Sequence, residues 1–277
     1  MVANATFSVR FWGVRGSIPC PGEANARYGG NTACIEMRCG EHLLIFDAGT
    51  GIHELGYELD HSEPIDADIF LTHTHYDHVW GWPHFTPLLR RRNRFLLHAG
   101  HLEGGEKIEH IMLGLIDDPL NPVNRKTLAA DLSFHDFQIG NTLTPRPGIT
   151  IRTASLVHPN RAVGYRVEFA GRAVCYLTDT EHQPGVLDAN ILRLIEGADV
   201  MIYDATYSDD EYPSHAGWGH STWQEGARLC AAARVKTYVV FHHDPSHDDT
   251  IMDRIAEEVQ AMRPGSIVAR EGMVLTP

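Results

Sequence analysis

Short apolar runs separated by polar segments rich in glycine and proline make up most of this chain. Apolar runs of this kind, bounded by turn-forming residues, predict buried β-strands. Several of the runs are continuously apolar, which predicts strands that are covered on both faces. Strands are expected near Phe7–Trp12, Ala33–Arg38, Leu43–Phe46, Ile69–Leu71, Phe95–His98, Ile149–Ala154, Val163–Phe169, Ala173–Leu177, Val200–Tyr203, Tyr238–Phe241, Ile267–Ala269 and Met273–Leu275.

Helical periodicity is present in fewer places. A short helix is expected to end near Leu59, and three longer ones are expected at Lys107–Ile116, at Ser221–Ala233 and from Asp248 or Asp249 to Pro264. The chain therefore runs through strands with a few helices, and then through the same again. This order predicts an α+β fold in which two stacked mixed β-sheets are flanked by helices.

Three local features add detail to this picture. Ser221 and Gln224 have the spacing of a capping box at the start of their helix. The aromatic residues within Val79–Phe85 are expected to pack in the core, and the run Arg90–Arg94 to cap a helix C-terminus and face solvent. Residues 99–148 are rich in turns, which suggests an irregular insertion over the functional site.

Length, composition and charge exclude some classes of protein. A chain of 277 residues without a convincing linker favours a single domain over residues 1–277. No apolar run approaches the about 18 residues of a membrane span, and Met1–Arg10 lacks the pattern of a secretion signal. Five scattered cysteines without a CxxC pair favour reduced thiols and a cytoplasmic location. The net charge of −13 disfavours long nucleic acid as a partner, because its binding depends on neutralised phosphates.

The segment from Ile69 to His78 contains the strongest chemical signal. An apolar strand stops abruptly, and His73, His75, Asp77 and His78 follow within six residues. Alternation along an extended chain places the first three of these side chains on one side, and a turn after Asp77 can return His78 to the same place. Imidazole and carboxylate ligands suit zinc and its neighbours in the first transition row. The alternative, a polar surface loop, does not account for this spacing after a buried strand. Most of the 18 histidines, among them His61 and His101, are instead expected to be surface or core residues.

Other polar residues also stand where apolar strands end. His158, Asp179 and His242 follow strands, and His243 competes with His242 for the same role. Asp47 and Asp204 occupy similar positions, and for Asp47 a bracing role and a direct role in the site are equally favoured. Such residues converge on one rim of a sheet, where they are numerous enough to bind two metal ions.

These motifs, in this order, resemble the metallo-β-lactamase superfamily, whose fold is an αββα sandwich. The resemblance implies that His73, His75 and His158 hold one metal ion. It implies that Asp77, His78 and His242 hold a second ion, and that Asp179 bridges the two. The ions are expected to be divalent, with zinc favoured over manganese and iron.

A narrower resemblance concerns the substrate. Tyr203–Tyr207 and Gly219–Thr222 resemble two motifs of the ribonuclease Z branch and its phosphodiesterase relatives. In that branch an acidic residue pairs with a histidine that handles the proton of the leaving group, which implies these roles for Asp204 and His220. Asp204 stands where ribonuclease Z usually has glutamate. Asp77 completes the predicted catalytic set.

The expected function is metal-dependent hydrolysis of a small phosphodiester, such as a cyclic nucleotide or another cyclic phosphate. A hydroxide that bridges the metals would attack phosphorus, and His220, held by Asp204, would protonate the departing oxygen. The alternatives are hydrolysis of a carbonyl substrate (a lactone, thioester or β-lactam), RNA processing as in ribonuclease Z, and a metal-dependent accessory protein without turnover. Relatives often form dimers, so a homodimer is a further expectation, and no membrane partner is expected.

Overall fold

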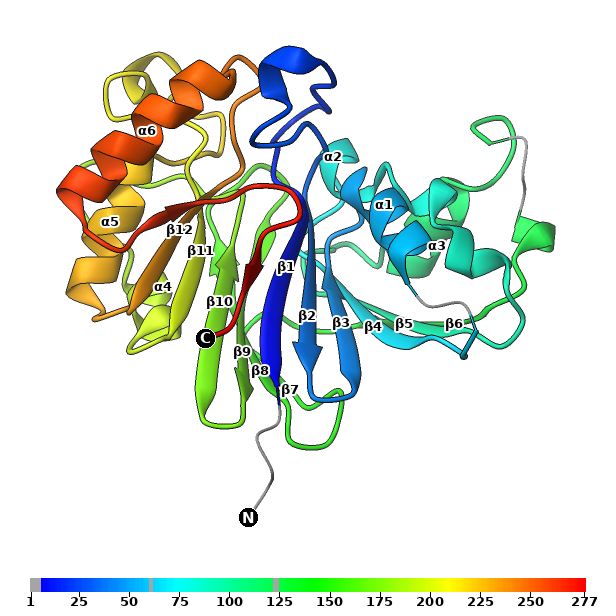
Figure 1. The fold of residues 1–277 in the computed structure, drawn as a ribbon. Coiled ribbons are helices and arrows are strands. Elements are labelled where there is room, and N and C mark those ends of the chain that lie inside the picture. Colours follow the sequence, from blue (N-terminus) through cyan, green and yellow to red (C-terminus); the bar gives the residue numbers. More distant parts are fainter. Residues whose placement is uncertain (1–5, 60–61, 122–124) are drawn as a thin grey trace.

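Two β-sheets stacked face to face form the centre of the molecule (Figure 1). The computed structural model describes residues 6–59, 62–121 and 125–277. The expectations that concern residues 1–5 and His61 lie outside the described residues. Within the described part of the chain, no helix has both the length and the apolar character that a membrane span requires.

The first sheet has seven strands in the order β14-β1-β2-β3-β4-β5-β6. From β3 to β6 the strands are parallel, whereas β1 pairs antiparallel with both of its neighbours. The strands are β1 (Phe7–Gly13), β2 (Cys34–Cys39), β3 (His42–Phe46), β4 (Asp66–Leu71), β5 (Arg94–Ala99), β6 (Asp131–Asp136) and β14 (Val274–Leu275).

The second sheet also has seven strands, in the order β13-β12-β11-β10-β9-β8-β7. Its strands are parallel from β10 to β13 and antiparallel from β7 to β10. The strands are β7 (Thr142–Leu143), β8 (Thr150–Leu156), β9 (Ala162–Phe169), β10 (Arg172–Leu177), β11 (Val200–Asp204), β12 (Thr237–Phe241) and β13 (Ile267–Val268).

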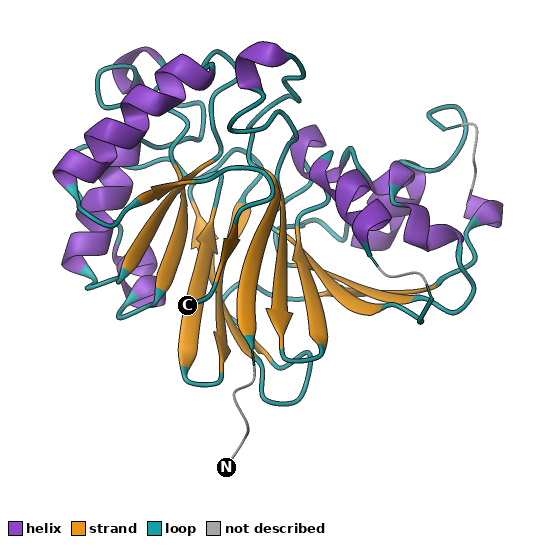
Figure 2. Cartoon of the chain, viewed as in Figure 1, coloured by secondary structure: helices purple, strands orange, loops and turns teal. Residues whose placement is uncertain are grey.

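Helices cover the outer face of each sheet (Figure 2). Helices α1 (Gly51–Glu58) and α3 (Ile108–Gly114) pack on the first sheet, and α2 (Tyr76–Val79) lies at its rim. Helices α4 (Ala189–Ile195), α5 (Trp223–Ala232) and α6 (Asp249–Met262) pack on the second sheet. Buried apolar residues from both sheets, such as Phe46 and Tyr165, fill the space between them. This layering confirms the predicted αββα sandwich.

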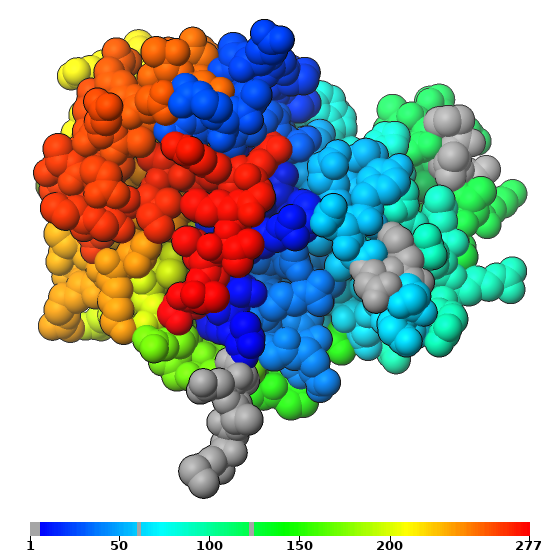
Figure 3. All heavy atoms as spheres, viewed as in Figure 1, coloured from blue at the N-terminus to red at the C-terminus, as the bar shows by residue number. Residues whose placement is uncertain are grey.

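The C-terminal segment joins the two sheets. It adds β13 to the second sheet and then crosses to pair with β1, where Val9 lies opposite Leu275. The space-filling view shows the C-terminal residues in red against the blue N-terminal strand (Figure 3). Both terminal strands were expected from the apolar runs near Ile267 and Met273.

The expected capping box at Ser221 is wrong. Thr222 caps α5, and its hydroxyl accepts a hydrogen bond from the backbone N–H of Glu225 at 3.1 Å. Ser221 is fully buried, and its hydroxyl bonds instead with the Tyr203 hydroxyl at 2.9 Å and with His182 Nδ1 at 2.8 Å. Burial and these partners therefore move the start of the helix by one residue.

The segment 99–148 is more regular than expected. It contains α3, which the sequence predicted at Lys107–Ile116, and the strands β6 and β7, which sequence reasoning missed. Strand β6 lies at the edge of the first sheet, and only Leu132 and Phe134 provide large apolar side chains. A half-exposed edge strand of this kind gives a weak apolar signal.

The residues before this segment also differ in part from expectation. Trp82 and Phe85 are buried as predicted, but Trp80 is 43% exposed. The arginines of the run face solvent, as predicted. The helix that they follow is a short 3₁₀ helix at Thr86–Leu89 and not an α-helix. The other 3₁₀ helices are at Glu23–Asn25, Trp82–His84, Arg125–Thr127 and Tyr212–Ser214.

Candidate metal centre

Polar residues from both sheets meet at one rim, next to α2 in Figure 1. Asp47 directly follows β3, His73 stands two residues after β4, and Asp179 two residues after β10. Asp204 is the last residue of β11, and His242 directly follows β12. Because these strands run in parallel within each sheet, their carboxyl ends bring the five side chains to the same edge.

Three of these residues have left-handed backbone conformations. The φ angles are 61° at Asp47, 62° at Asp179 and 64° at His242. Such angles are uncommon for residues other than glycine, and they cluster at functional sites because the surrounding structure must hold them. Here each one turns the chain immediately after a buried strand.

The first cluster consists of His73, His75 and His158, whose ligand nitrogens lie within 4.8 Å of one another. The Nδ1 of His158 donates to the Gly219 carbonyl at 2.8 Å, which leaves its Nε2 facing the cluster. The Nδ1 of His73 lies 3.1 Å from the hydroxyl of Thr72. The structure therefore orients the rings of His158 and His73 through their outer nitrogens, as metal-binding histidines require.

The second cluster consists of Asp77, His78, Asp179 and His242, all of them buried. Helix α2 returns His78 to the cluster, but it begins at Tyr76, so the chain turns before Asp77 and not after it as expected. The backbone N–H of Ser17 donates to Asp77 Oδ2 at 2.7 Å and holds that carboxylate from the other side of the site.

Asp179 lies between the two clusters and presents one oxygen to each. Its Oδ1 is 3.8 Å from His73 Nε2 and 3.6 Å from His158 Nε2. Its Oδ2 is 3.1 Å from His78 Nε2 and 3.3 Å from His242 Nε2. This arrangement fits a carboxylate that is shared by two metal ions.

Unpartnered nitrogen atoms provide an independent test of metal binding. The Nε2 atoms of His73, His78 and His242 are buried and have no hydrogen-bond partner among the described residues. Buried polar atoms without partners are rare, and they call for an unseen ion or water. Imidazole nitrogens and carboxylate oxygens are also the donor set of zinc sites. The residues present therefore fit two divalent ions.

The electrostatics of the rim keep its carboxylates ionised. Burial alone would raise the pKa of Asp179, but the positive charges of His242 and His78 outweigh it and lower this pKa well below its usual range. Burial would likewise raise the pKa of Asp77, but the nearby charge of His78 and the closeness of His242 outweigh burial and lower this pKa. Metal ions bind ionised carboxylates and neutral imidazoles, so metal binding would release the proton that His78 carries in the metal-free protein.

Asp47 braces the second cluster. It is fully buried, and its oxygens accept hydrogen bonds from the Thr72 backbone N–H at 2.8 Å and from the Tyr176 hydroxyl at 2.9 Å. Its Oδ2 also lies 2.9 Å from His78 Nδ1. These contacts favour the bracing role, one of the two that the sequence left open.

Thr206 is a site residue that sequence reasoning missed. Its hydroxyl lies 3.0 Å from His242 Nδ1 and donates to Asp204 Oδ1 at 2.8 Å. It thereby holds the ring of His242 and connects it to the neighbouring carboxylate. Its place two residues after Asp204, within a segment already singled out, was the available signal.

His220 and Asp204 form a pair beside the clusters. The Nδ1 of His220 lies 2.9 Å from Asp204 Oδ2, and Asp204 is fully buried. Burial alone would lower the pKa of His220, but the charge and hydrogen bond of Asp204 outweigh it and raise this pKa to about 9. The backbone N–H of Asp179 also donates to Asp204 Oδ2, at 2.9 Å. With Asp179 and His242, the pair also forms a third, overlapping group of ligand atoms.

The structure separates His242 from its competitor His243. His242 Nε2 faces Asp77 and Asp179, whereas His243 Nε2 donates to the Ala269 carbonyl at 2.9 Å. His243 therefore connects the end of β12 to the C-terminal segment, away from both clusters. This geometry favours His242, the residue that directly follows the strand.

A cavity of about 530 Å³ opens at the rim. Its polar side includes His75, Asp77, Asp179 and His220, together with Ser17 and Thr74. Its other side is formed by Tyr76, Val79, Ile111 and Leu115. The cavity therefore gives a small ligand access to both clusters and to the His220–Asp204 pair.

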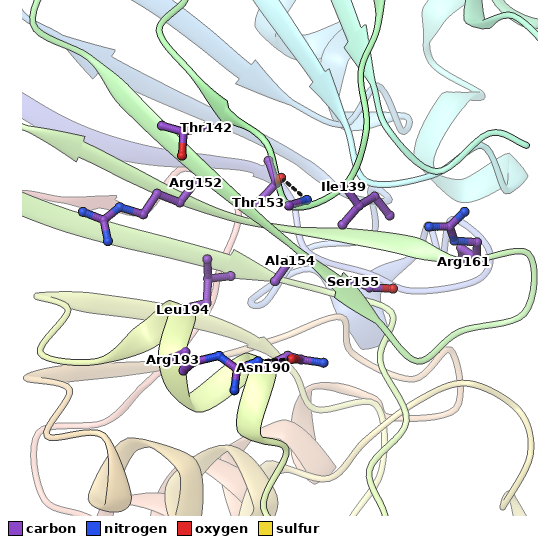
Figure 4. A pocket seen from close by; sticks show the side chains of 11 residues that line it. Ile139, Thr142, Arg152, Thr153, Ala154, Ser155, Arg161, Asn190, Arg193 and Leu194 are labelled. Atoms are coloured by element: carbon purple, nitrogen blue, oxygen red, sulfur yellow. Dashed lines mark hydrogen bonds between the residues drawn. The ribbon is translucent and has the colours of Figure 1, made fainter.

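A second cavity, of about 500 Å³, lies between β8 and α4 (Figure 4). Three arginines line it, but Figure 4 shows Arg152 and Arg161 at opposite ends of the labelled group. Arg152 pairs with Glu168 at 3.4 Å, and Arg161 pairs with Glu103. None of the described residues that line this cavity is a histidine or a carboxylate, so it is not a second metal centre.

Fold and site together define the class of protein. The family model of the β-lactamase superfamily domain matches residues 42–243, which include most of the rim. The chain therefore belongs to this superfamily, as the motifs predicted. Within it, the curated relatives below are named ribonuclease Z, which supports the expectation of a hydrolase, and the solved structures below share the fold.

Two curated relatives illustrate the similarity. A ribonuclease Z from Parabacteroides distasonis is 29% identical over 111 residues, which cover 40% of this chain and 34% of that protein. The matched part thus spans about a third of that relative's length. A ribonuclease Z from Porphyromonas gingivalis is 22% identical over 321 aligned positions, which cover 97% of this chain and 98% of that protein.

Three solved structures share the fold. The metallo-β-lactamase fold protein YhfI from Bacillus subtilis has a TM-score of 0.73 and 17% identity, with 99% of this chain and 100% of that chain covered. The short form of human tRNase Z has a TM-score of 0.71 and 19% identity, with 97% and 98% covered. A diphosphatase from the PhnP family has a TM-score of 0.71 and 20% identity, with 97% of each chain covered.

Proposed function

We propose that this chain is a binuclear metal-dependent phosphodiesterase that hydrolyses a small phosphodiester, such as a cyclic nucleotide or another cyclic phosphate. The observation that carries the proposal is the His220–Asp204 pair beside the two clusters, with its nitrogen and oxygen 2.9 Å apart. Hydrolysis of an ester with a poor leaving group gains from such a proton donor. The relatives named ribonuclease Z and the diphosphatase of similar fold support the same class of bond.

In this proposal, His73, His75 and His158 hold one ion, and Asp77, His78 and His242 hold the other, with Asp179 shared. Zinc is favoured by the donor set, and manganese and iron are the alternatives. When bound, two such ions supply Lewis acidity, which activates water at neutral pH and polarises a phosphate oxygen.

The residues of the chain handle the leaving group. His220 has its Nδ1 engaged by Asp204 and lines the cavity, so its Nε2 is the atom that can reach a substrate. In the metal-free protein its pKa is raised to about 9, chiefly by Asp204, so the ring carries a proton at neutral pH. As the bond between phosphorus and the leaving oxygen breaks, His220 gives its proton to that oxygen and becomes neutral, and water returns the proton afterwards. Asp204, which stays ionised, holds the ring in place.

The names of the relatives favour a second candidate, cleavage of an RNA phosphodiester. It uses the same bond chemistry and differs in the size of the substrate. Of the described residues that line the rim cavity, none is lysine or arginine, and the chain carries a net charge of −13. Long nucleic acid is bound mainly through neutralised phosphates, so these features favour the small substrate.

A substrate panel tests the proposal. Protein loaded with zinc, manganese or iron is assayed with 3′,5′-cyclic AMP, bis(p-nitrophenyl) phosphate, a precursor tRNA, lactones and thioesters. Elemental analysis measures the bound metal, and protein stripped with a chelator is the control. We expect turnover of small phosphodiesters that needs metal and exceeds turnover of the carbonyl substrates. Faster cleavage of the precursor tRNA would favour the second candidate. Turnover of lactones or thioesters alone would overturn the proposal, as would no turnover by the metal-loaded protein.

We also propose that residues 1–277 form one domain in which segment 99–148 covers the site. Apolar residues from β1 through the C-terminal segment share the core between the sheets, and Ile111 and Leu115 of that segment line the rim cavity. A homodimer and a cytoplasmic location stay predictions.

A further inference from the structure

The apolar side of the rim cavity belongs to two neighbouring helices. Tyr76 and Val79 come from α2, while Ile111 and Leu115 come from α3 and the residue that caps it. The Nε1 of Trp82 donates to the Met112 carbonyl at 3.1 Å and holds α3 against the segment that follows α2. The apolar side is therefore fixed by contacts of its own and needs no ligand to form.

An exposed aromatic pair continues this apolar side. Tyr76 is 66% exposed and Trp80, four residues later, is 43% exposed. Their rings stack with centroids 5.4 Å apart and an angle of 22° between their planes. Trp80 stacks on Tyr76 and is not among the residues that line the cavity, whereas Tyr76 lines it together with Asp77. A planar, supported ring beside ionised metal ligands is suited to a substrate that carries both a phosphate and an aromatic ring.

We propose that Tyr76, Ile111 and Leu115 bind the nucleobase of the substrate while its phosphate lies at the metal clusters. This inference rests on the proposed function and narrows its substrate class to nucleotide phosphodiesters. The volume of about 530 Å³ lies in the usual range for small-ligand sites, which bury most of their ligand. Stacking on aromatic side chains holds bases of any sequence, because every base has a π-face. The apolar side offers few hydrogen-bonding groups, so the site discriminates only weakly between bases.

The test measures binding, not turnover. Isothermal titration of the zinc-loaded protein compares adenosine 5′-monophosphate with ribose 5-phosphate, which has the phosphate and sugar but no base. We expect the nucleotide to bind on the order of 10-fold more tightly, the effect of one stacked base. The affinities of cytidine and uridine 5′-monophosphates should lie within a few-fold of the affinity of adenosine 5′-monophosphate.

Substitutions show which residues are responsible for the preference for the nucleotide. Tyr76→Leu should remove most of the preference for the nucleotide, and Tyr76→Phe should retain it, because the ring and not the hydroxyl stacks. Ile111→Ser should weaken the preference from the other helix. His110→Ser, an exposed position on the same helix, is the matched control and should leave it intact. Metal content is measured for each variant, and if Tyr76→Leu loses metal, Ile111→Ser carries the test.

Equal affinities for the two ligands would overturn the inference, as would a preference that survives both Tyr76→Leu and Ile111→Ser. Turnover of bis(p-nitrophenyl) phosphate is measured in parallel. If the enzyme is active but does not prefer the nucleotide over ribose 5-phosphate, the proposed function stands and this inference is wrong. If the protein hydrolyses no phosphodiester but prefers the nucleotide, and Tyr76→Leu removes that preference, the nucleobase site stands and the proposed function is wrong.

Discussion

The Nδ1 atom of His78 lies 2.9 Å from Oδ2 of Asp47, and both side chains are fully buried. This contact fixes the ring so that its Nε2 faces Asp77 and Asp179, at 3.3 Å and 3.1 Å. Asp47 is not itself part of a cluster of ligand atoms. It connects the end of β3 to the second cluster and decides which nitrogen of His78 is available to a metal ion.

Replacing Asp47 should therefore weaken metal binding at the second cluster. In Asp47→Asn one carboxylate oxygen becomes an NH₂ group, which donates and cannot accept, so the bond from Thr72 or from Tyr176 is lost. The neutral amide also no longer favours a proton on His78 Nδ1. Loss of such an outer contact typically costs about 10- to 100-fold in metal affinity. Zinc titration and elemental analysis measure the effect. Tyr176→Phe, which removes one donor to the same carboxylate, is the milder control, and equal metal affinity in Asp47→Asn would contradict the bracing role.

The second prediction concerns the leaving group. His220→Ala should lower turnover of an alkyl phosphodiester by about 100-fold or more, the usual contribution of a positioned acid. The loss on bis(p-nitrophenyl) phosphate should be much smaller, because p-nitrophenolate leaves without a proton. Steady-state kinetics on the two substrates measure the ratio of the losses.

His215→Ala is the matched control for this prediction. His215 lies in the same loop, and its ring stacks on Tyr207 with centroids 4.2 Å apart, but it belongs to no group of ligand atoms among the described residues. It should leave the ratio between the two substrates unchanged. Equal losses on both substrates in His220→Ala would rule out the acid role and favour His220 as a metal ligand.

A close backbone approach gives the third prediction. A Cβ added at Gly16 would lie 2.3 Å from Cε1 and 2.4 Å from Nδ1 of His242, so alanine there must displace the ring. Gly16→Ala should lose the metal of the second cluster and about 1–3 kcal/mol of stability. Gly114→Ala, where nothing lies within 4 Å of the added Cβ, is the control. Two zinc ions per chain in Gly16→Ala would show that the loop can move away.

The parts of the site that the sequence predicted are those that follow buried strands. At His73, Asp179 and His242 an apolar run ends abruptly in a ligand-type residue, and parallel strands bring such ends together. The fold followed from the same runs, since continuously apolar strands need cover on both faces. The apolar runs thus predicted the architecture, and position after a strand predicted which polar residues meet at the rim.

The parts that could not be predicted depend on contacts between distant segments. Ser17 reaches Asp77 across 60 residues, and Gly16 meets the ring of His242 only because the first loop folds over β12. No local sequence pattern predicts contacts between segments so far apart in the chain. Ser221 and Thr222 are both good helix caps by type, and burial decides between them. The edge strand β6 was missed because half of its residues face solvent.

Two adjacent histidines give the fourth prediction. His242→Ala should bind one metal ion fewer, because it removes a nitrogen that faces Asp77 and Asp179. His243→Ala should keep both ions but lose about 1–3 kcal/mol of stability, since the Ala269 carbonyl loses its donor. Elemental analysis and chemical denaturation of both variants separate the two roles. If His243→Ala were the variant that lost a metal ion, the assignment of the second cluster would be wrong.

The last prediction is a dependence of stability on pH in the metal-free protein. Burial would lower the pKa of His220, but Asp204 raises it from the ordinary 6.5 to about 9. A raised histidine pKa in the folded state means that the charged ring stabilises the fold. Its contribution is complete at and below about pH 6.5 and is lost as the pH rises through 9. The change from 6.5 to about 9 corresponds to about 3 kcal/mol.

The experiment compares the chelator-treated wild type with His220→Gln, so that titration of the other groups largely cancels. Denaturant unfolding at a series of pH values measures the free energy of unfolding of both proteins. The difference between the wild type and His220→Gln should be about 3 kcal/mol larger at pH 6 than at pH 10. Asp204→Asn should remove most of this pH dependence, because Asp204 raises the pKa of His220 more than Asp179 or Asp77 does. A stability difference that stays constant between pH 6 and 10 would mean that His220 is neutral in the folded protein. It could then not donate the proton that the proposed reaction requires.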